Sequence, residues 1–362
     1  APAALFAAAM RFASAKRYAE LEQEIDALSA KLSEILQADF AKSSEAHDPA
    51  YLKAAVGSAD SDELDFDELA HLLAEKPADV ETQKQRDRRV EQTWLVIKSL
   101  RTLFARESAP VPVSAATSTL AGALGQAMAH YRQFLEFFRA LHIARLEVAG
   151  KYRDDRHDRY FATFSFKHLS ADEYALLPPF PIHIRAANWH EIDRSALIDI
   201  LGSELPLKVL LTVEKIHAAE LLETGVSTAV GWPGKLASMA QALDNAFVLQ
   251  TVSSDMANLA DGLQNGMLYN GPALFSVYAS TARASQRVAP YLQAAAALES
   301  RVFPAFTFDP AAGAVLADKM TVALTPHCER DWPVDTLDYH DAQGEAAPME
   351  SAFTTADFAV FS

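Results

Sequence analysis

Three short runs of sequence decide the fold: LKVLLTV at Leu207–Val213, FVLQTV at Phe247–Val252 and ALFSVY at Ala273–Tyr278. Each run is almost continuously apolar and rich in β-branched or aromatic residues, which is typical of a strand buried on both faces of a sheet. A helical pattern, which we expect Ser253 or Ser254 to cap, separates the second run from the third. Continuous apolar strands separated by helices predict an α/β fold with a largely parallel sheet and helices on both faces.

The same alternation of strand and helix starts at about residue 180. Residues 182–185 are expected to form a strand, and Asp193 or Ser195 is expected to open the helix after it. Residues 235–244 are expected to form the helix between the first two decisive runs. The βαβ rhythm therefore extends over about one hundred residues in the second half of the chain.

The first half of the chain has a different pattern. Its apolar residues recur at intervals of three and four, the period of an amphipathic helix. These residues form four apolar stripes, and the helix that carries the third stripe is expected to end before Pro110 and Pro112. The four stripes are Leu21, Ile25, Leu28, Leu32 and Ile35; Phe66, Leu69, Leu72 and Leu73; Trp94, Ile97, Leu100 and Phe104; and Leu120, Leu124, Met128, Tyr131, Leu135 and Phe138. The sequence thus predicts that a helical region precedes the sheet.

We expect three consecutive segments: a helical region at 1–165, an α/β domain at 166–302 and a C-terminal wrapping segment at 303–362. The last segment is rich in Pro, Asp and aromatic residues, and it predicts loops and short strands. Phe353, Phe358 and Phe361 are interpreted as a docking strip, so we expect a dimer or a larger complex. The chain opens with Ala1 and Pro2, and we expect a processed product or a piece of a longer polypeptide.

Composition excludes several classes of function. The chain has 362 residues with 48 Asp and Glu against 32 Lys and Arg, and its formal charge of −16 would repel a nucleic acid backbone. Its one cysteine, Cys328, can form no intrachain disulfide and cannot hold an iron–sulfur cluster, which normally needs four thiolates. No apolar run approaches the length of a membrane span, and we expect a cytoplasmic protein.

Several stretches resemble the thiamine diphosphate domain of the pyruvate:ferredoxin (2-oxoacid:ferredoxin) oxidoreductase family. These stretches are LPLKVLL at 205–211, LASMA at 236–240, NAFVLQ at 245–250, YNGPAL at 269–274 and ALESRVFPAFTFDP at 297–310. The resemblance implies a thiamine-diphosphate-binding-like α/β fold, in which the helical first half is an insertion in the same module. It also implies 2-oxoacid chemistry on thiamine diphosphate in a complete relative, with electrons passed to iron–sulfur clusters.

The residues that should hold the cofactor are missing. The family holds the diphosphate through Mg²⁺ with a Gly-Asp-Gly at one strand end, whereas this chain has Arg185 and Ala186 there. The family's Asn-Thr-Gly-Gly loop has only a distant echo in Thr224 and Gly225, and Asn188 is the one amide near the first strand end. We therefore expect no cofactor and no metal; Asn188, Thr224 and Gly225 would be the cofactor-binding residues only if a remnant pocket binds.

Other candidate sites have a plainer interpretation beside the functional one. The run GWPGK at 231–235 suits either a phosphate-binding loop before a helix or a simple turn and cap. His157 lies among the charged residues of 153–159, which favour a solvated helix end over a metal site. Cys328 stands between His327 and Glu329, but neighbours in sequence seldom point at each other, so a nucleophile is disfavoured.

Four further residues flank the degenerate strand end. His183 and His190 would line a remnant pocket or serve as structural histidines. Glu191 and Asp193 would act as an acid or base, or simply as helix-start carboxylates that complement the helix dipole.

Three hypotheses of function follow. The favoured one is a non-catalytic thiamine-type domain or subunit with a structural or docking role in a 2-oxoacid:ferredoxin oxidoreductase-like redox assembly, whose other subunits would carry the iron–sulfur clusters. The second is an active oxidoreductase component that binds thiamine diphosphate and Mg²⁺ through an altered loop. The third is a partner-binding scaffold, since fold does not fix function.

Overall fold

The computed structural model describes residues 2–41, 46–56, 65–73, 80–99, 111–113, 119–186, 193–214, 232–280, 289–323 and 334–352. Its contacts divide the chain into two compact units. The first, called the sheet unit, comprises Ala1–Lys16, Glu107–Ala129 and Leu177–Ser362. The second, called the helical unit, comprises Arg17–Arg106 and His130–Leu176.

This division differs from the three consecutive segments expected from the sequence. The helical unit consists of two segments, and each of them interrupts the sequence of the sheet unit. Helices α1, Pro2–Phe40, and α6, Leu120–Val148, contribute residues to both units. The expected C-terminal segment at 303–362 falls within the sheet unit and does not separate as a segment of its own.

Seven of the described strands of the sheet unit form one sheet in the order β1-β2-β3-β5-β4-β6-β7. The strands β1, β2, β3, β5 and β4 run parallel to their neighbours in this order. At the far edge, β6 pairs antiparallel with β4, and β7 pairs antiparallel with β6. The predicted α/β fold with a mostly parallel sheet is confirmed, and β3, β4 and β5 have the predicted bounds. The seven strands are β1 Val111–Val113, β2 Phe180–Ala186, β3 Leu207–Val213, β4 Phe247–Val252, β5 Ala273–Tyr278, β6 Phe306–Phe308 and β7 Met320–Val322.

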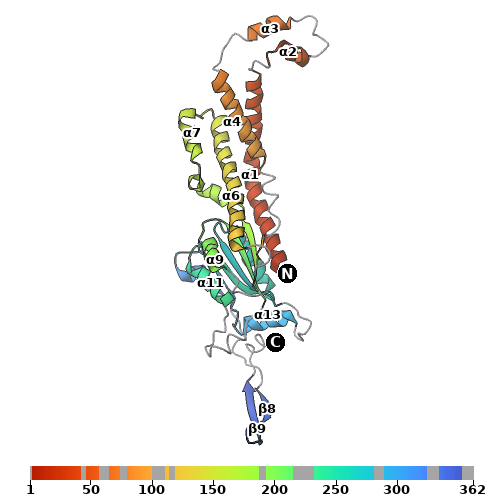
Figure 1. Cartoon of the computed structure of the whole chain (residues 1–362), viewed down its shortest axis with the longest axis vertical. Coiled ribbons are helices and arrows are strands. Elements are labelled where there is room, and N and C mark those ends of the chain that lie inside the picture. Colours follow the sequence, from red (N-terminus) through yellow and green to blue (C-terminus); the bar gives the residue numbers. More distant parts are fainter. Residues whose placement is uncertain are drawn as a thin grey trace. The chain divides into compact units, whose positions relative to one another are not determined.

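Helices cover both faces of this sheet. All six residues of β4 and all six of β5 are buried, so neither face of these strands is open to solvent. One face packs against α12 and the start of α1, where Phe6 meets Phe275 edge to face at 5.7 Å. In Figure 1, α9 and α11 lie across the sheet from the start of α1. The helices of this unit after β2 are α9 Arg194–Leu201, α11 Trp232–Ala242, α12 Met256–Leu268, α13 Pro290–Glu299 and α14 Leu316–Lys319.

Helix α12 lies very close to the sheet because glycines form its inner face. A Cβ added at Gly266 would lie 2.5 Å from the ring of Phe275 and 2.7 Å from that of Phe247. A Cβ at Gly262 would lie 2.6 Å from a methyl group of Leu249. The two glycines therefore make room for the large side chains of β4 and β5.

A buried lysine joins β3 to the turn after α12. Lys208 is fully buried, and its Nζ donates hydrogen bonds of 2.7 Å to the carbonyl oxygens of both Tyr269 and Gly271. The ring of Tyr269 lies 5.5 Å from the same Nζ, within the range of a cation–π contact. A buried charge needs such partners, so Lys208 fixes the position of this turn.

One local expectation for the sheet unit was wrong. The cap of α12 is Asp255, whose carboxylate accepts from the backbone N of Asn258, and not Ser253 or Ser254. Pro112 lies inside the edge strand β1. Proline is compatible with an edge strand because one side of such a strand needs no hydrogen-bond donors.

The C-terminal segment contains the expected short strands and a hairpin. Strands β8, Val334–His340, and β9, Ala346–Ala352, pair antiparallel over seven residues. Within the described residues, neither strand pairs with a third. The docking strip of Phe353, Phe358 and Phe361 lies outside the described residues.

The helical unit has a core of aliphatic and aromatic side chains from its long helices. The predicted stripe on α1 is confirmed at Leu21, Ile25, Leu28 and Leu32, which are all buried, while its last member, Ile35, is half-buried. Leu72 of the second stripe is instead 63% exposed. None of the described helices has the length and apolar character needed to cross a bilayer. Besides parts of α1 and α6, the unit contains α2 Pro49–Val56, α3 Phe66–Leu73, α4 Val80–Lys98, α7 Asp154–Ala162, η1 Phe166–His168 and α8 Ala171–Ala175.

The close approach of α12 to the sheet predicts the effect of Gly266→Ala. We expect this substitution to lower the unfolding free energy by roughly 1–3 kcal/mol, because the buried rings of Phe247 and Phe275 have no space to move into. The measurement is the unfolding midpoint of the purified chain in urea, followed by circular dichroism. Gly125→Ala is the matched control: a Cβ there meets nothing within 4 Å, so the better helix former should stabilise α6 by about 0.5–1 kcal/mol. A shift of the same sign in both variants would contradict the packing argument.

Candidate functional site

Four polar side chains meet at the carboxyl ends of β2 and β3. Successive side chains of a strand point to opposite faces, and the parallel register of the two strands places His183, Arg185, Thr212 and Glu214 on the same face. The Nε2 atom of His183 shares a hydrogen bond of 3.0 Å with the hydroxyl of Thr212. Nη2 of Arg185 forms an ion pair of 3.0 Å with a carboxylate oxygen of Glu214.

The burial of His183 and the positive charge of Arg185 beside it both disfavour protonation of the histidine. Burial of the imidazole lowers the pKa of His183, and the Arg185 guanidinium lowers it further, while the carboxylate of Glu214 opposes both effects. The histidine is therefore mainly neutral at neutral pH and suits hydrogen bonding with Thr212. The interpretation of His183 as a structural histidine is consistent with this pairing.

The described residues here do not fit a site for magnesium and thiamine diphosphate. Mg²⁺ requires oxygen ligands in octahedral geometry. The strand end offers the Arg185 guanidinium and Ala186 where the resemblance implies Gly-Asp-Gly, and the nearby Glu214 carboxylate is already held by Arg185. In the described part of the chain, no group of three or more His, Cys, Asp or Glu side chains is arranged to hold a metal ion.

The sheet has a topological switch point between β4 and β5. The chain passes from β3 to β4, leaving a gap, and then returns through α12 to place β5 in that gap. Ligands of open α/β sheets bind at such points. Here Asp255 caps α12, and the hydroxyl of Ser280 bonds to the side chain of Gln293, so these polar groups are used to fix the strand ends.

Most of the predicted site residues lie outside the described residues. This holds for Asn188, Thr224 and Gly225, the remnant-pocket candidates. It also holds for His190 and Glu191 beside the strand end, and for the group at His327, Cys328 and Glu329.

Three other candidates are placed by the structure. The carboxylate of Asp193 caps α9 by accepting from the backbone N of Ala196 at 3.1 Å, as its helix-start interpretation predicts. Residues 232–235 form the first turn of α11, so they are not a phosphate-binding loop before it. Nδ1 of His157 accepts a hydrogen bond of 2.8 Å from the backbone N of Arg153, which occupies it at the start of α7.

The charged segment at 153–159 is more than a solvated helix end. Its Asp154 accepts a hydrogen bond of 2.8 Å from Arg89 of α4. Its Asp158 accepts one of 2.7 Å from the hydroxyl of Tyr152, and burial together with this bond raises the pKa of Tyr152. The guanidinium of Arg89 lies 3.9 Å from the centre of the Tyr152 ring. This segment is thus attached to α4 by specific polar contacts.

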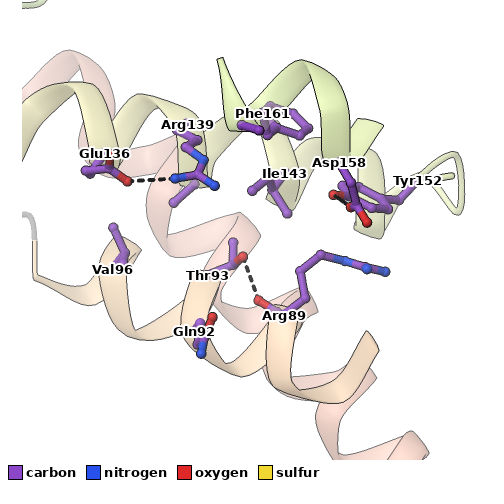
Figure 2. A pocket seen from close by; sticks show the side chains of 12 residues that line it. Arg89, Gln92, Thr93, Val96, Glu136, Arg139, Ile143, Tyr152, Asp158 and Phe161 are labelled. Carbon is purple, nitrogen blue, oxygen red and sulfur yellow. Dashed lines mark hydrogen bonds and ion pairs between the residues drawn. The ribbon is translucent and has the colours of Figure 1, made fainter. Parts of the chain in front are cut away.

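These contacts border a cavity of about 320 Å³ within the helical unit (Figure 2). Sequence reasoning missed it, because its residues come from α4, α6 and the segment 152–162 and show no common spacing. The repeated occurrence of arginine and acidic residues in all three segments is the one signal in the sequence. The lining comprises Arg89, Gln92, Thr93, Val96, Glu136, Arg139, Ala140, Ile143, Tyr152, Asp158, Phe161 and Ala162.

A second hollow of about 380 Å³ is also lined in part by α7, and two of its basic side chains, Arg145 and His142, are already paired. Arg145 binds Glu24 at 2.7 and 3.0 Å and Glu173 at 2.7 Å, and His142 binds the same oxygen of Glu173 at 2.8 Å. Burial would raise the pKa of Glu173, but the backbone N of Ser170, with Arg145 and His142, outweighs it and lowers the pKa. These groups stabilise the helical unit and are not free to bind a ligand.

No protein-family model matches this chain, and no curated protein matches it.

The lowered pKa of His183 predicts a pH dependence of stability. A histidine whose pKa is lower in the folded than in the unfolded chain disfavours folding when it is protonated. The folded state should therefore lose stability as the pH falls below about 6.5, the ordinary histidine value, until the folded pKa is passed. The measurement is the unfolding free energy at several pH values in wild type and in His183→Gln, which should lose less stability over this window. His71→Gln, at an exposed histidine of α3, is the control and should follow wild type. If the unfolding free energy changed with pH in the same way in all three proteins, His183 would not be the cause of the pH dependence.

Proposed function

We propose that this chain is a non-catalytic thiamine-type domain or subunit with a structural or docking role in a 2-oxoacid:ferredoxin oxidoreductase-like redox assembly. The family assignment rests on the sequence resemblance. The α/β architecture, with strands that overlap the stretches in which the resemblance was found, is consistent with it.

The ion pair between Arg185 and Glu214 carries the non-catalytic part of the proposal. It places a guanidinium at the strand end where a magnesium ligand would be needed, and it engages a carboxylate of the neighbouring strand. A cation and Mg²⁺ compete for the same carboxylate oxygens, and the cation also repels the metal. Chemistry that depends on a magnesium-bound diphosphate is therefore disfavoured at this edge.

The hairpin of β8 and β9 supports the docking part. Every described side chain from residue 338 to 346 except Asp341 is exposed. A two-stranded hairpin is marginally stable on its own in water, and its unpaired edges can accept another strand. A partner subunit that covers the hairpin would stabilise it and would pair or protect its open edges.

The two alternatives remain distinct proposals. An active thiamine diphosphate-dependent component would need Asn188, Thr224 and Gly225 to build the site, and all three lie outside the described residues. A partner-binding scaffold would also dock to another protein, as in the favoured proposal, but that protein would not belong to a redox assembly. The two experiments below separate these possibilities.

The first experiment tests cofactor binding by thermal shift. A ligand that binds only the folded state raises the unfolding temperature. We expect no rise when Mg²⁺ and thiamine diphosphate are added together to the purified chain, because Arg185 holds Glu214. Each component alone is the internal control, and a thiamine diphosphate enzyme in the same assay shows that the conditions report binding. A saturable, magnesium-dependent rise would support the active component instead.

The second experiment tests docking by affinity purification of the tagged chain from its native cells. We expect a protein with cysteine-rich iron–sulfur motifs to co-purify, and we expect Tyr339→Asp on the exposed face of β8 to reduce its recovery. Tyr51→Asp is the control, since Tyr51 is similarly exposed, 47% against 44%, but belongs to the helical unit. Co-purification only of proteins without such motifs would favour the scaffold, and equal recovery with both variants would argue against the hairpin.

A further inference from the structure

The sequence contains two Asn-Gly pairs, and they lie five residues apart. Asn265-Gly266 is inside α12, while Asn270-Gly271 lies in the turn between α12 and β5. Of the five asparagines in the chain, these two alone precede a glycine. The pairs have the same residue types in different surroundings, so the fold decides how readily each of them reacts.

An asparagine that precedes a glycine can lose its side-chain amide without any enzyme. The backbone nitrogen of the glycine attacks the side-chain carbonyl carbon of the asparagine and closes a five-membered imide. Glycine has no Cβ, so it neither blocks this approach nor restricts the backbone rotation that the approach requires. The attack is fastest where the nitrogen makes no hydrogen bond and the backbone is not held in a helix.

The pair inside α12 is held against this reaction. The helix spans Met256–Leu268, and backbone nitrogens in a helix interior donate to carbonyl oxygens four residues earlier. Gly266 also packs directly on the sheet, since a Cβ there would lie 2.5 Å from the ring of Phe275. Closing an imide at Asn265 would therefore require this turn of the helix to open first.

The pair in the turn is open to the reaction. Asn270 is exposed, and among the described residues neither its side chain nor the backbone N of Gly271 makes a hydrogen bond. Lys208 holds the turn through the carbonyl oxygens of Tyr269 and Gly271, each at 2.7 Å. Those carbonyls belong to the peptide groups on either side of the one that joins Asn270 to Gly271. The reacting peptide group is the one that the lysine leaves unbound.

We propose that Asn270 is a site of spontaneous deamidation. The backbone N of Gly271 forms a bond to Cγ of Asn270, the bond from Cγ to the amide nitrogen breaks, and ammonia leaves with the proton that the Gly271 nitrogen gives up. Water, the one co-reactant, then opens the imide at either of its carbonyl carbons. The residue at position 270 becomes aspartate or isoaspartate, and no group is oxidised or reduced.

The isoaspartate product changes the contact that fixes the turn. Its main chain runs through Cβ, which adds a methylene between the two carbonyl groups that Lys208 binds. Lys208 is fully buried, and a buried charge that loses an acceptor costs free energy. The aspartate product keeps the normal backbone and places its new carboxylate at an exposed position. We therefore expect isoaspartate to lower the stability of the fold more than aspartate does.

The test follows both pairs by peptide mapping of the purified full chain after incubation in mildly alkaline buffer, with digestion in acidic buffer. We expect the mass change of an amide converted to an acid, in two separable isomers, at Asn270. Asn265 should react at least about fivefold more slowly, the factor that corresponds to one net hydrogen bond. The control is the chain unfolded in urea, in which both pairs should react at comparable rates. Equal rates in the folded chain, or the same difference in the unfolded chain, would overturn the proposal.

Two variants test the assignment and its consequence. Asn270→Gln should not form the new species, because its longer side chain closes a larger ring more slowly; persistence of the species would place the modification elsewhere. Asn270→Asp carries the aspartate product without isoaspartate. We expect the isoaspartate form, separated by chromatography, to unfold at a lower urea concentration than Asn270→Asp. Equal midpoints would show that the turn accommodates the added methylene and would overturn the effect on Lys208.

Discussion

Burial of β4 and β5 on both faces is the constraint on which the sheet unit depends. Because no side chain of these strands reaches solvent, every connection must return across the sheet and cover it. This explains the glycines of α12, which allow a helix to lie directly on Phe247, Leu249 and Phe275. Two long polar side chains of the strands reach backbone carbonyls in the connections. Gln250 donates to the carbonyl of Pro304 at 2.8 Å, and Lys208 donates to two carbonyls after α12.

The same burial determined what the sequence could predict. A strand that is apolar at most positions has sharp boundaries in the sequence, so β3, β4 and β5 were predicted with their observed bounds. Strand β1 has only three residues and contains Pro112, and its partner residues in β2 lie about seventy positions further along the chain. The cap of α12 was misassigned because Ser253, Ser254 and Asp255 are all good caps, and only the position of β4 decides among them.

The candidate sites were predicted less well, for a related reason. Residue types at a strand end can be read directly, and the degenerate end at Arg185 and Ala186 was recognised in that way. Its pairing with Glu214 could not be read, because it requires the register of β2 against β3. The cavity in the helical unit depends on side chains from three elements whose packing follows no simple period. Apolar stripes predict that helices pack, but they do not predict where the packing leaves space.

The two units bury charge in different ways. In the sheet unit, the buried Lys208 donates to two backbone carbonyls and so holds the turn after α12. In the helical unit, Glu147 accepts from Arg86 at 3.2 Å and from Arg89 at 2.8 Å, while Arg86 also binds Asp39. Networks of this kind hold side chains at fixed positions. The helical unit therefore pairs its buried carboxylates with arginines of neighbouring helices, whereas the polar groups at the strand ends of the sheet bind one another.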